Sequence, residues 1–169
     1  MDKNIVLIGM MGSGKTTVGK LLAGCLRRPF VDTDALIEER EGRSIPEIFT
    51  RDGESAFRAL ELALARELSG RDGLIIACGG GLPMQNEAIA ALKQNGLVFW
   101  LDRDPVETYD SLDLSGRPLA RSGREDFVRR YQDRVSVYRR WSDHIIPSTD
   151  DPGPAVARIA AICLEVSAP

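Results

Sequence analysis

The segment with the clearest chemical potential lies near the start of the chain and reads Gly9-Met10-Met11-Gly12-Ser13-Gly14-Lys15-Thr16. It matches the pattern GxxxxGK(S/T) at every fixed position, between an apolar run and a helical pattern. Glycines at this spacing let successive backbone N–H groups point inward at phosphate oxygens, and the start of the helix adds its positive dipole end. A ligand-free turn needs one glycine, not three with a lysine and a threonine. The segment therefore predicts a site for nucleotide phosphates.

Lys15 and Thr16 have separate expected roles in this phosphate loop. The Lys15 ammonium supplies a mobile positive charge for the β- and γ-phosphates, and the Thr16 hydroxyl is a hard oxygen ligand for a Mg²⁺ ion that bridges them. The loop alone does not tell whether the nucleotide drives chemistry, switches a signal or holds the fold together. The residues expected to bind the nucleotide are Gly12, Ser13, Gly14, Lys15, Thr16 and Thr17.

Two carboxylates follow the second apolar run, at Asp32 and Asp34. The carboxyl ends of parallel strands meet at one edge of a sheet, so these side chains are expected near the phosphate loop. Carboxylates in that place could serve a metal ion or orient and deprotonate an attacking hydroxyl. The alternative is helix capping by Thr33 or Asp34, which would leave Asp32 without a role.

Hydrophobic periodicity predicts the elements that position these residues. Short apolar runs predict strands at 4–8, 30–34, 74–78, 97–101 and 144–146. Helical spacing predicts helices at 16–27, 35–41, 44–51, 53–69, 83–94, 125–141 and 155–166, with a short helix from Pro105. Ser44 and Glu47 predict a capping box. Strands that alternate with helices favour an α/β fold with a parallel sheet covered on both faces.

Length and charge narrow the class of protein. A chain of 169 residues suits one core better than two, so residues 1–169 are predicted to form a single domain. The net charge of −3 gives no general attraction to polyanions, so neither nucleic acid nor a membrane is an expected partner. The first residues contain no signal-peptide core, which predicts a cytoplasmic location. No exposed apolar stripe demands a partner, so a monomer is expected.

The segment 111–126 breaks the pattern of regular elements. It reads SLDLSGRPLARSGRED, has no sustained period, and is rich in glycine, serine, arginine and proline. Such composition favours a loop over a helix or strand. We therefore expect a mobile lid at 111–126.

Several short segments, in their order and spacing after the phosphate loop, resemble the shikimate kinase family. They are Asp32-Thr33-Asp34, Gly42-Arg43-Ser44-Ile45, Asp52-Gly53-Glu54, Phe57-Arg58, Gly79-Gly80-Gly81 and Arg117-Pro118-Leu119. The resemblance runs from Lys3 to about Pro154. It implies a three-layer αβα P-loop fold like that of nucleoside monophosphate kinases, with a five-stranded parallel sheet, a helical substrate-binding region at about 33–61 and a closing lid.

The resemblance also implies an activity, the ATP-dependent phosphorylation of the 3-hydroxyl of shikimate in the pathway to chorismate and the aromatic amino acids. ATP, Mg²⁺ and a small-molecule acceptor are the ligands it implies, and transfer would be direct and in line. Asp32 would lie with Thr16 on the Mg²⁺ side. The implied catalytic residues are Lys15, Asp34 and Arg117, of which Arg117 would reach the nucleotide from the lid. The implied substrate-binding residues are Asp34, Arg58, Gly79, Gly80, Gly81 and Arg134.

Three questions stay open at this point. Without the resemblance, Arg58 would read as part of a solvated, salt-bridged face with Glu54 and Glu61. The family usually carries an arginine against adenine just before the lid, where this chain has Tyr109 and Asp110, and a basic residue is common where this chain has the short acidic stretch 149–152. Three alternatives follow: Tyr109 stacks on the base, Arg121 reaches across to it, or ATP binds weakly. The alternative functions are a gluconate-type or nucleoside monophosphate kinase, and a catalytically inactive nucleotide-binding regulatory domain.

Overall fold

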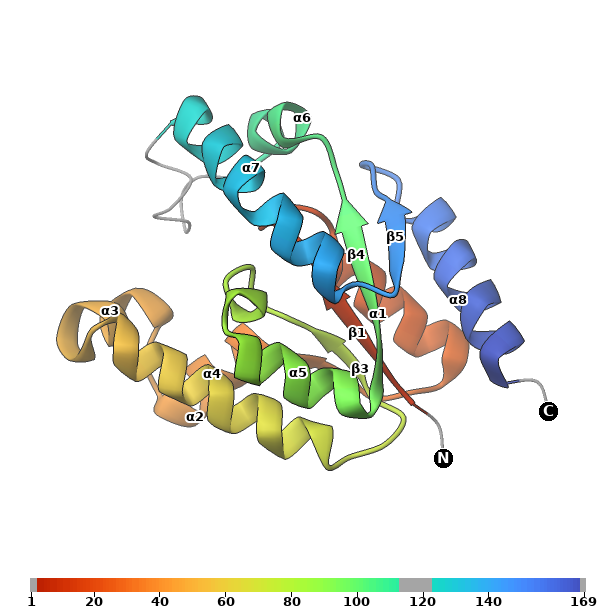
Figure 1. The fold of residues 1–169 in the computed structure, drawn as a ribbon, viewed down its shortest axis with the longest axis horizontal. Coiled ribbons are helices and arrows are strands. Elements are labelled where there is room, and N and C mark those ends of the chain that lie inside the picture. Colours follow the sequence, from red (N-terminus) through yellow and green to blue (C-terminus); the bar gives the residue numbers. More distant parts are fainter. Residues whose placement is uncertain (1–2, 113–122, 168–169) are drawn as a thin grey trace.

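The computed structural model describes residues 3–112 and 123–167, and in these residues five parallel strands form one sheet in the order β2-β3-β1-β4-β5 (Figure 1). This confirms the predicted five-stranded parallel sheet. Strand β1 lies at the centre of the sheet, and all five of its residues are buried. Four of them are apolar, and the side chain of the fifth, Asn4, is hydrogen-bonded to backbone groups. The strands are β1 (Asn4–Ile8), β2 (Phe30–Asp32), β3 (Ile75–Ala77), β4 (Gly96–Asp102) and β5 (His144–Pro147).

Helices connect the strands and cover both faces of the sheet, as the alternating pattern predicts (Figure 1). Helices α2 and α3, with the start of α4, extend beyond the strand ends (Figure 1). The helices are α1 (Lys15–Leu26), α2 (Thr33–Glu41), α3 (Ile45–Asp52), α4 (Glu54–Ser69), α5 (Asn86–Gln94), α6 (Pro105–Asp110), α7 (Arg124–Trp141) and α8 (Gly153–Ser167), with a 3₁₀ turn η1 at Leu82–Met84.

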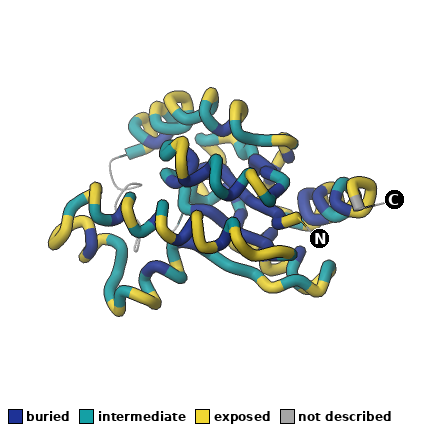
Figure 2. Tube along the Cα trace, turned by 60° about the horizontal axis from the view of Figure 1, so that its bottom comes forward, coloured by how far each residue is buried: buried dark blue, intermediate teal, exposed yellow. Residues whose placement is uncertain are grey.

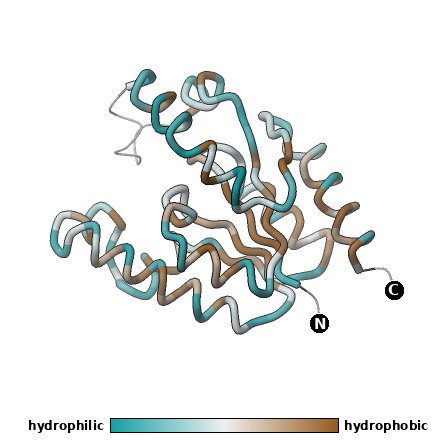
Figure 3. The backbone as a smooth tube through the Cα atoms, viewed as in Figure 1, coloured by the Kyte–Doolittle hydropathy of each residue, from teal (hydrophilic) through white to brown (hydrophobic). Residues whose placement is uncertain are grey.

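The central strands divide their side chains between two cores because successive residues of a strand point to opposite faces. Val6 and Ile8 of β1 pack in the core that α4, α5 and α7 complete. Ile5 and Leu7 pack in the core of α1 and α8. Buried and hydrophobic residues gather along the central strands and the inner sides of the helices (Figures 2 and 3). Both layers therefore hold the strand ends in fixed positions.

The ends of three helices can be compared with the predictions from the sequence: one agrees and two differ. Ser44 and Glu47 form the expected capping box of α3. The cap of α2 is Asp32, whose Oδ1 accepts from the backbone N–H groups of Asp34 and Ala35, so the alternative in which Thr33 or Asp34 caps this helix is wrong. The helix expected at 83–94 is broken at Gln85, which separates η1 from α5.

Among the residues described, no helix has both the length and the apolar character needed to cross a membrane.

Candidate active site

A single cavity of about 1280 Å³ brings most of the predicted site residues together at the carboxyl edge of the sheet. This is the edge at which open α/β sheets bind ligands. Ser13 and Gly81 do not line it: Ser13 is a buried residue of the phosphate loop, and Gly81 lies against Arg58. The predicted residues that line the cavity are Gly12, Gly14, Lys15, Thr16, Thr17, Asp32, Asp34, Arg58, Gly79, Gly80 and Arg134.

Lys15 is folded back onto its own phosphate loop. Its Nζ donates hydrogen bonds to the carbonyl oxygens of Gly9 at 2.8 Å and Met10 at 2.7 Å. Burial lowers the pKa of Lys15 to about 8, while the nearby carboxylate of Asp34 opposes that shift. The ammonium is thus a desolvated cation, whose attraction for a phosphate is stronger than in bulk water.

The Thr16 hydroxyl is oriented by a carboxylate. It donates to Asp32 Oδ2 at 2.8 Å, while Oδ1 of the same carboxylate caps α2. Because the Thr16 hydroxyl hydrogen points at Asp32 in this hydrogen bond, the lone pairs of the Thr16 oxygen are available to another partner. The two residues together offer the hard oxygen ligands that Mg²⁺ prefers.

The described part of the chain has no group of three or more His, Cys, Asp or Glu side chains that could hold a metal ion by themselves. A Mg²⁺ ion at Thr16 and Asp32 would therefore need oxygen ligands from a bound nucleotide. This fits the usual way in which Mg²⁺ is held, by one or two protein oxygens together with substrate phosphates and water.

Asp34 is the carboxylate that is short of a partner. Its Oδ1 is buried and accepts no hydrogen bond from the described residues. Burial raises the pKa of Asp34 to about 6, with a further rise from Asp32 and an opposing effect of Lys15. A Cβ atom at Gly79 would come within 2.4 Å of Oδ1, so this glycine makes room for the carboxylate. Asp34 is thus placed and poised to accept a proton or hydrogen bond from a hydroxyl in the cavity.

Arg58 does not belong to a solvated face, contrary to the reading without the resemblance. Its Nη1 donates to Glu61 Oε2 at 2.5 Å, and Glu61 is only 1% exposed. Gln85 Nε2 donates to the same oxygen at 2.7 Å. Burial raises the pKa of Glu61 to about 7, against the opposing effect of Arg58. A Cβ atom at Gly81 would lie 2.7 Å from Arg58 Nη2, so the guanidinium is fixed between a buried acid and a glycine.

Arg134 reaches the cavity from α7, next to the glycine loop. Its Nη1 would lie 3.3 Å from a Cβ atom at Gly80. The hydroxyl of Tyr138, one turn later on α7, donates to the Gly80 carbonyl oxygen at 2.8 Å. Helix α7 and the glycine loop are therefore tied together, with Arg134 and Arg58 facing one cavity from separate elements.

The residues suggested for the nucleotide base are not all confirmed. Tyr109 packs against Phe127, with ring centroids 5.7 Å apart, and is not among the residues that line the cavity. Stacking of Tyr109 on the base therefore stays a prediction from the sequence. Arg117 and Arg121 lie outside the described residues, as does most of the lid expected at 111–126.

The sequence analysis gave no role at the site to three residues that line or support the cavity: Glu61, Arg103 and Asp150. Glu61 lies one turn after Arg58, so its pairing could be foreseen but its burial could not. Arg103 and Asp150 are far apart in the chain and meet only because β4 and β5 are neighbours in the sheet. No local pattern marks either residue.

Comparison with known proteins gives one family. The family model described as shikimate kinase matches residues 11–165. A shikimate kinase of Pelotomaculum thermopropionicum is 45% identical over 80% of this chain and 81% of its own length. One from Clostridium beijerinckii is 36% identical over 98% of this chain and 97% of its own. The chain belongs to the shikimate kinase family.

A solved structure extends this likeness to three dimensions. The shikimate kinase from Acinetobacter baumannii in complex with shikimate has a TM-score of 0.90 and 34% sequence identity, and the match covers 100% of this chain and 97% of that one. The P-loop kinase fold of shikimate kinases is therefore present over the whole domain. Neither a gluconate-type nor a nucleoside monophosphate kinase is favoured by these relatives, and this shikimate kinase family member is an ATP-using enzyme.

Proposed function

We propose that this chain transfers the γ-phosphoryl group of ATP to the 3-hydroxyl of shikimate. One observation carries the proposal: a single cavity holds a phosphate loop together with two arginines, Arg58 and Arg134, and the carboxylate of Asp34, whose Oδ1 has no hydrogen-bond partner among the described residues. The loop suits a triphosphate, and the arginines suit the carboxylate of an acid. The family and the relative solved with shikimate support the same acceptor.

The acceptor is held at both ends in this proposal. The planar guanidinium of Arg58, kept in place by Glu61, and that of Arg134 bind the carboxylate oxygens of shikimate. Asp34 accepts a hydrogen bond from the hydroxyl that attacks and takes its proton as the new O–P bond forms. By holding the carboxylate of shikimate, the two arginines fix the position of its 3-hydroxyl relative to Asp34 and the γ-phosphate, which favours in-line attack.

The charge that develops during transfer is met by the phosphate loop. Lys15 leaves the Gly9 and Met10 carbonyl oxygens to bind the β- and γ-phosphates of ATP, and the loop N–H groups bind the remaining oxygens. Mg²⁺, held with Thr16 and Asp32, supplies charge neutralisation when bound. Arg117 is proposed to add a positive charge from the lid. No covalent enzyme intermediate is needed.

An acceptor panel tests the activity. The chain is assayed for ADP release with Mg²⁺-ATP and, in separate reactions, shikimate, gluconate, AMP or no acceptor. We expect ADP release with shikimate alone, at least about a hundredfold above the other reactions, and a phosphorylated product by mass spectrometry. Equal ADP release in all four reactions, or none in any, would contradict the proposal. A cytoplasmic location and a monomeric state stay predictions from the sequence.

Replacing Arg58 tests how the acceptor is held. Arg58→Ala removes the clamp, and we expect the KM for shikimate to rise by about a hundredfold or activity to be lost, with the affinity for ATP unchanged. Arg58→Lys keeps the charge but cannot bind two oxygens in one plane, so an intermediate rise of about tenfold is expected. The matched control is Arg40→Ala on α2, which removes an exposed ion pair with Glu67. Unchanged shikimate kinetics in both Arg58 variants would refute the role.

The pH dependence tests the role of Asp34. Its pKa is raised to about 6, so the carboxylate loses its capacity to accept a proton as the pH falls through that value. We expect kcat/KM for shikimate to fall about tenfold per pH unit below about pH 6. Burial raises the pKa of Glu61 to about 7, so Glu61 also affects the pH profile. Glu61→Gln removes this second ionisation and leaves the fall in kcat/KM that Asp34 causes below about pH 6. A rate that stays constant down to pH 5 would exclude Asp34 as the base.

A further inference from the structure

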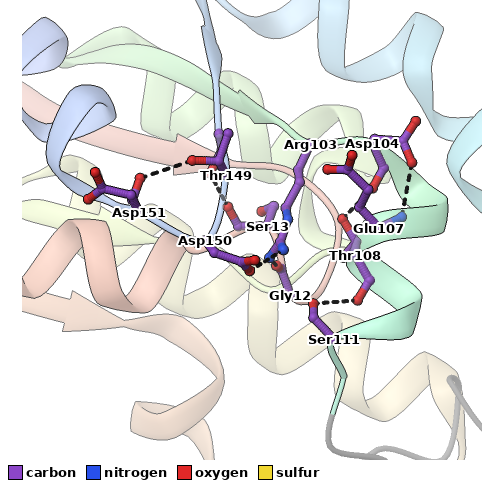
Figure 4. A network of polar contacts seen from close by, with 11 residues as sticks. Gly12, Ser13, Arg103, Asp104, Glu107, Thr108, Ser111, Thr149, Asp150 and Asp151 are labelled. Carbon is purple, nitrogen blue, oxygen red and sulfur yellow. Dashed lines mark hydrogen bonds and ion pairs between the residues drawn. The ribbon is translucent and has the colours of Figure 1, made fainter.

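Arg103 is a buried cation beside the phosphate loop for which the transfer step has no use. It directly follows β4, and its side chain is only 9% exposed. Its Nη1 donates to the carbonyl oxygen of Gly12 at 3.2 Å, and its Nη2 forms an ion pair with Asp150 from the loop between β5 and α8 (Figure 4). A carboxylate and a loop carbonyl thus fix the position of this guanidinium.

The sheet order places Arg103 on the opposite side of the phosphate loop from the acceptor. Among the acceptor residues, Asp34 follows β2 and the glycine loop follows β3, whereas Arg103 and Asp150 follow β4 and β5, and β1 lies between the two pairs of strands. All of them line the same cavity. Ser148, also after β5, donates to the Ser13 carbonyl oxygen at 2.6 Å, so this second side is packed directly against the loop.

The geometry of in-line transfer indicates which part of the nucleotide lies on this second side of the phosphate loop. The attacking and leaving oxygens lie on opposite sides of the phosphorus, so the ADP part of the nucleotide must extend away from the acceptor. With the acceptor on the side of Asp34 and Arg58, the ribose and base extend toward the loops after β4 and β5. Arg103, Thr149, Asp150 and Pro152 line the cavity there.

The Arg103 guanidinium lines the cavity and its hydrogen-bond donors are not all used, so it can contact a bound ligand. Its Nε is buried and has no hydrogen-bond partner among the described residues. Asp150, with a side chain that is 86% exposed, holds the group from the solvent side. Arginine planes stack well on aromatic rings, because the guanidinium is flat, delocalised and weakly hydrated.

We propose that the Arg103 guanidinium, held by the Gly12 carbonyl and the Asp150 carboxylate, is the surface on which the base of the bound nucleotide stacks. This accounts for an acid at 150, which alone would repel phosphates but here fixes a cation. It also supplies a base contact from a residue that lines the cavity, which Tyr109 does not. The proposal rests on the proposed function in two respects: it takes ATP as the phosphoryl donor, and it places the acceptor beside Asp34 and Arg58.

The alternative role of Arg103 is support of the phosphate loop through Gly12, with no contact to the base. Two ligands separate these roles, because ADP has a base and inorganic tripolyphosphate has none. Calorimetric affinities of both, with Mg²⁺ and the full chain, are measured for Arg103→Met, which removes the planar cation. The control is Arg66→Met on α4, which removes an exposed ion pair with Glu87.

A stacking role predicts a loss that depends on the base. In Arg103→Met we expect ADP to bind at least about fivefold more weakly, the lower range for loss of one stacked base, with tripolyphosphate affinity within about twofold of the original. The KM for ATP should rise while the KM for shikimate stays constant. An equal loss for both ligands would assign Arg103 to loop support alone, and no loss for either would remove it from the site. Both outcomes overturn the proposal.

A second variant keeps the test decisive if Arg103→Met does not fold. Asp150→Asn leaves the guanidinium but removes the charge that fixes it, and its side chain is exposed, so folding should be unaffected. We expect a weaker loss, about two- to fivefold, for ADP and none for tripolyphosphate. Unchanged or tighter ADP binding in Asp150→Asn would contradict the proposed anchoring. These binding measurements need no acceptor, so they stand apart from the test of shikimate phosphorylation.

Discussion

Lys15→Met is expected to lower kcat by about 10³-fold while the chain stays folded. The Lys15 ammonium is the buried cation of the phosphate loop, and removing one such stabilising group at a reacting centre costs about 10²–10³-fold or more. Folding should survive, because burial lowers the pKa of Lys15 and the charge is therefore a cost to the folded state. Steady-state kinetics and thermal unfolding together measure both effects.

The matched control for this variant is Lys20→Met, one turn further along α1 at an exposed position. It changes the net charge equally but does not line the cavity. We expect the control to keep the original kcat within about twofold. A Lys15→Met protein that keeps more than a tenth of its kcat would show that the phosphates are held and stabilised by other groups.

Asp34→Asn is expected to have opposite effects on activity and stability. The amide cannot accept the proton of the attacking hydroxyl, so kcat should fall by about 10²–10⁴-fold. The raised pKa of Asp34 means that its ionised form is unfavourable in the folded state. A neutral amide removes that cost, and the melting temperature at pH 7.5 should rise by about 4–8 °C, from roughly 2 kcal/mol in a domain of this size.

The sign of the stability effect can be checked by pH. The folded form of the original chain binds more protons than the unfolded form between about 3.8 and 6, so its stability falls as the pH rises through this range. The advantage of Asp34→Asn should therefore be complete above pH 6 and shrink toward pH 4. Glu39→Gln, at an exposed position of the same helix, is the control. A lower melting temperature for Asp34→Asn at pH 7.5 would mean that Asp34 is a stabilising partner in the fold.

The sequence predicted the sheet and the phosphate loop well because both depend on local patterns. The runs at 5–8 and 97–101 are apolar throughout and short, which favours strands buried on both faces. The loop motif fixes its own backbone, so its place between β1 and α1 follows directly. The boundaries of α3 were also predicted closely, since the capping box is a local signal.

What the sequence could not predict depends on contacts between distant residues. The burial of Glu61 depends on Gln85 and on the neighbouring helix α5, so a charged pair that looks solvated on α4 becomes an anchor for Arg58. The partnership of Arg103 with Asp150 depends on the order of β4 and β5 in the sheet. The role of Gly79 is likewise tertiary, because the space it leaves is filled by Asp34 from another strand end.

A crystal structure with a non-hydrolysable ATP analogue, Mg²⁺ and shikimate tests most directly whether the acceptor sits between Asp34 and the two arginines. The proposed mechanism predicts the shikimate carboxylate within hydrogen-bond distance of Arg58 and Arg134, and its 3-hydroxyl between Asp34 and the terminal phosphorus, with the base on the β4–β5 side. Shikimate bound elsewhere, or with its carboxylate turned toward the phosphate loop, would contradict it.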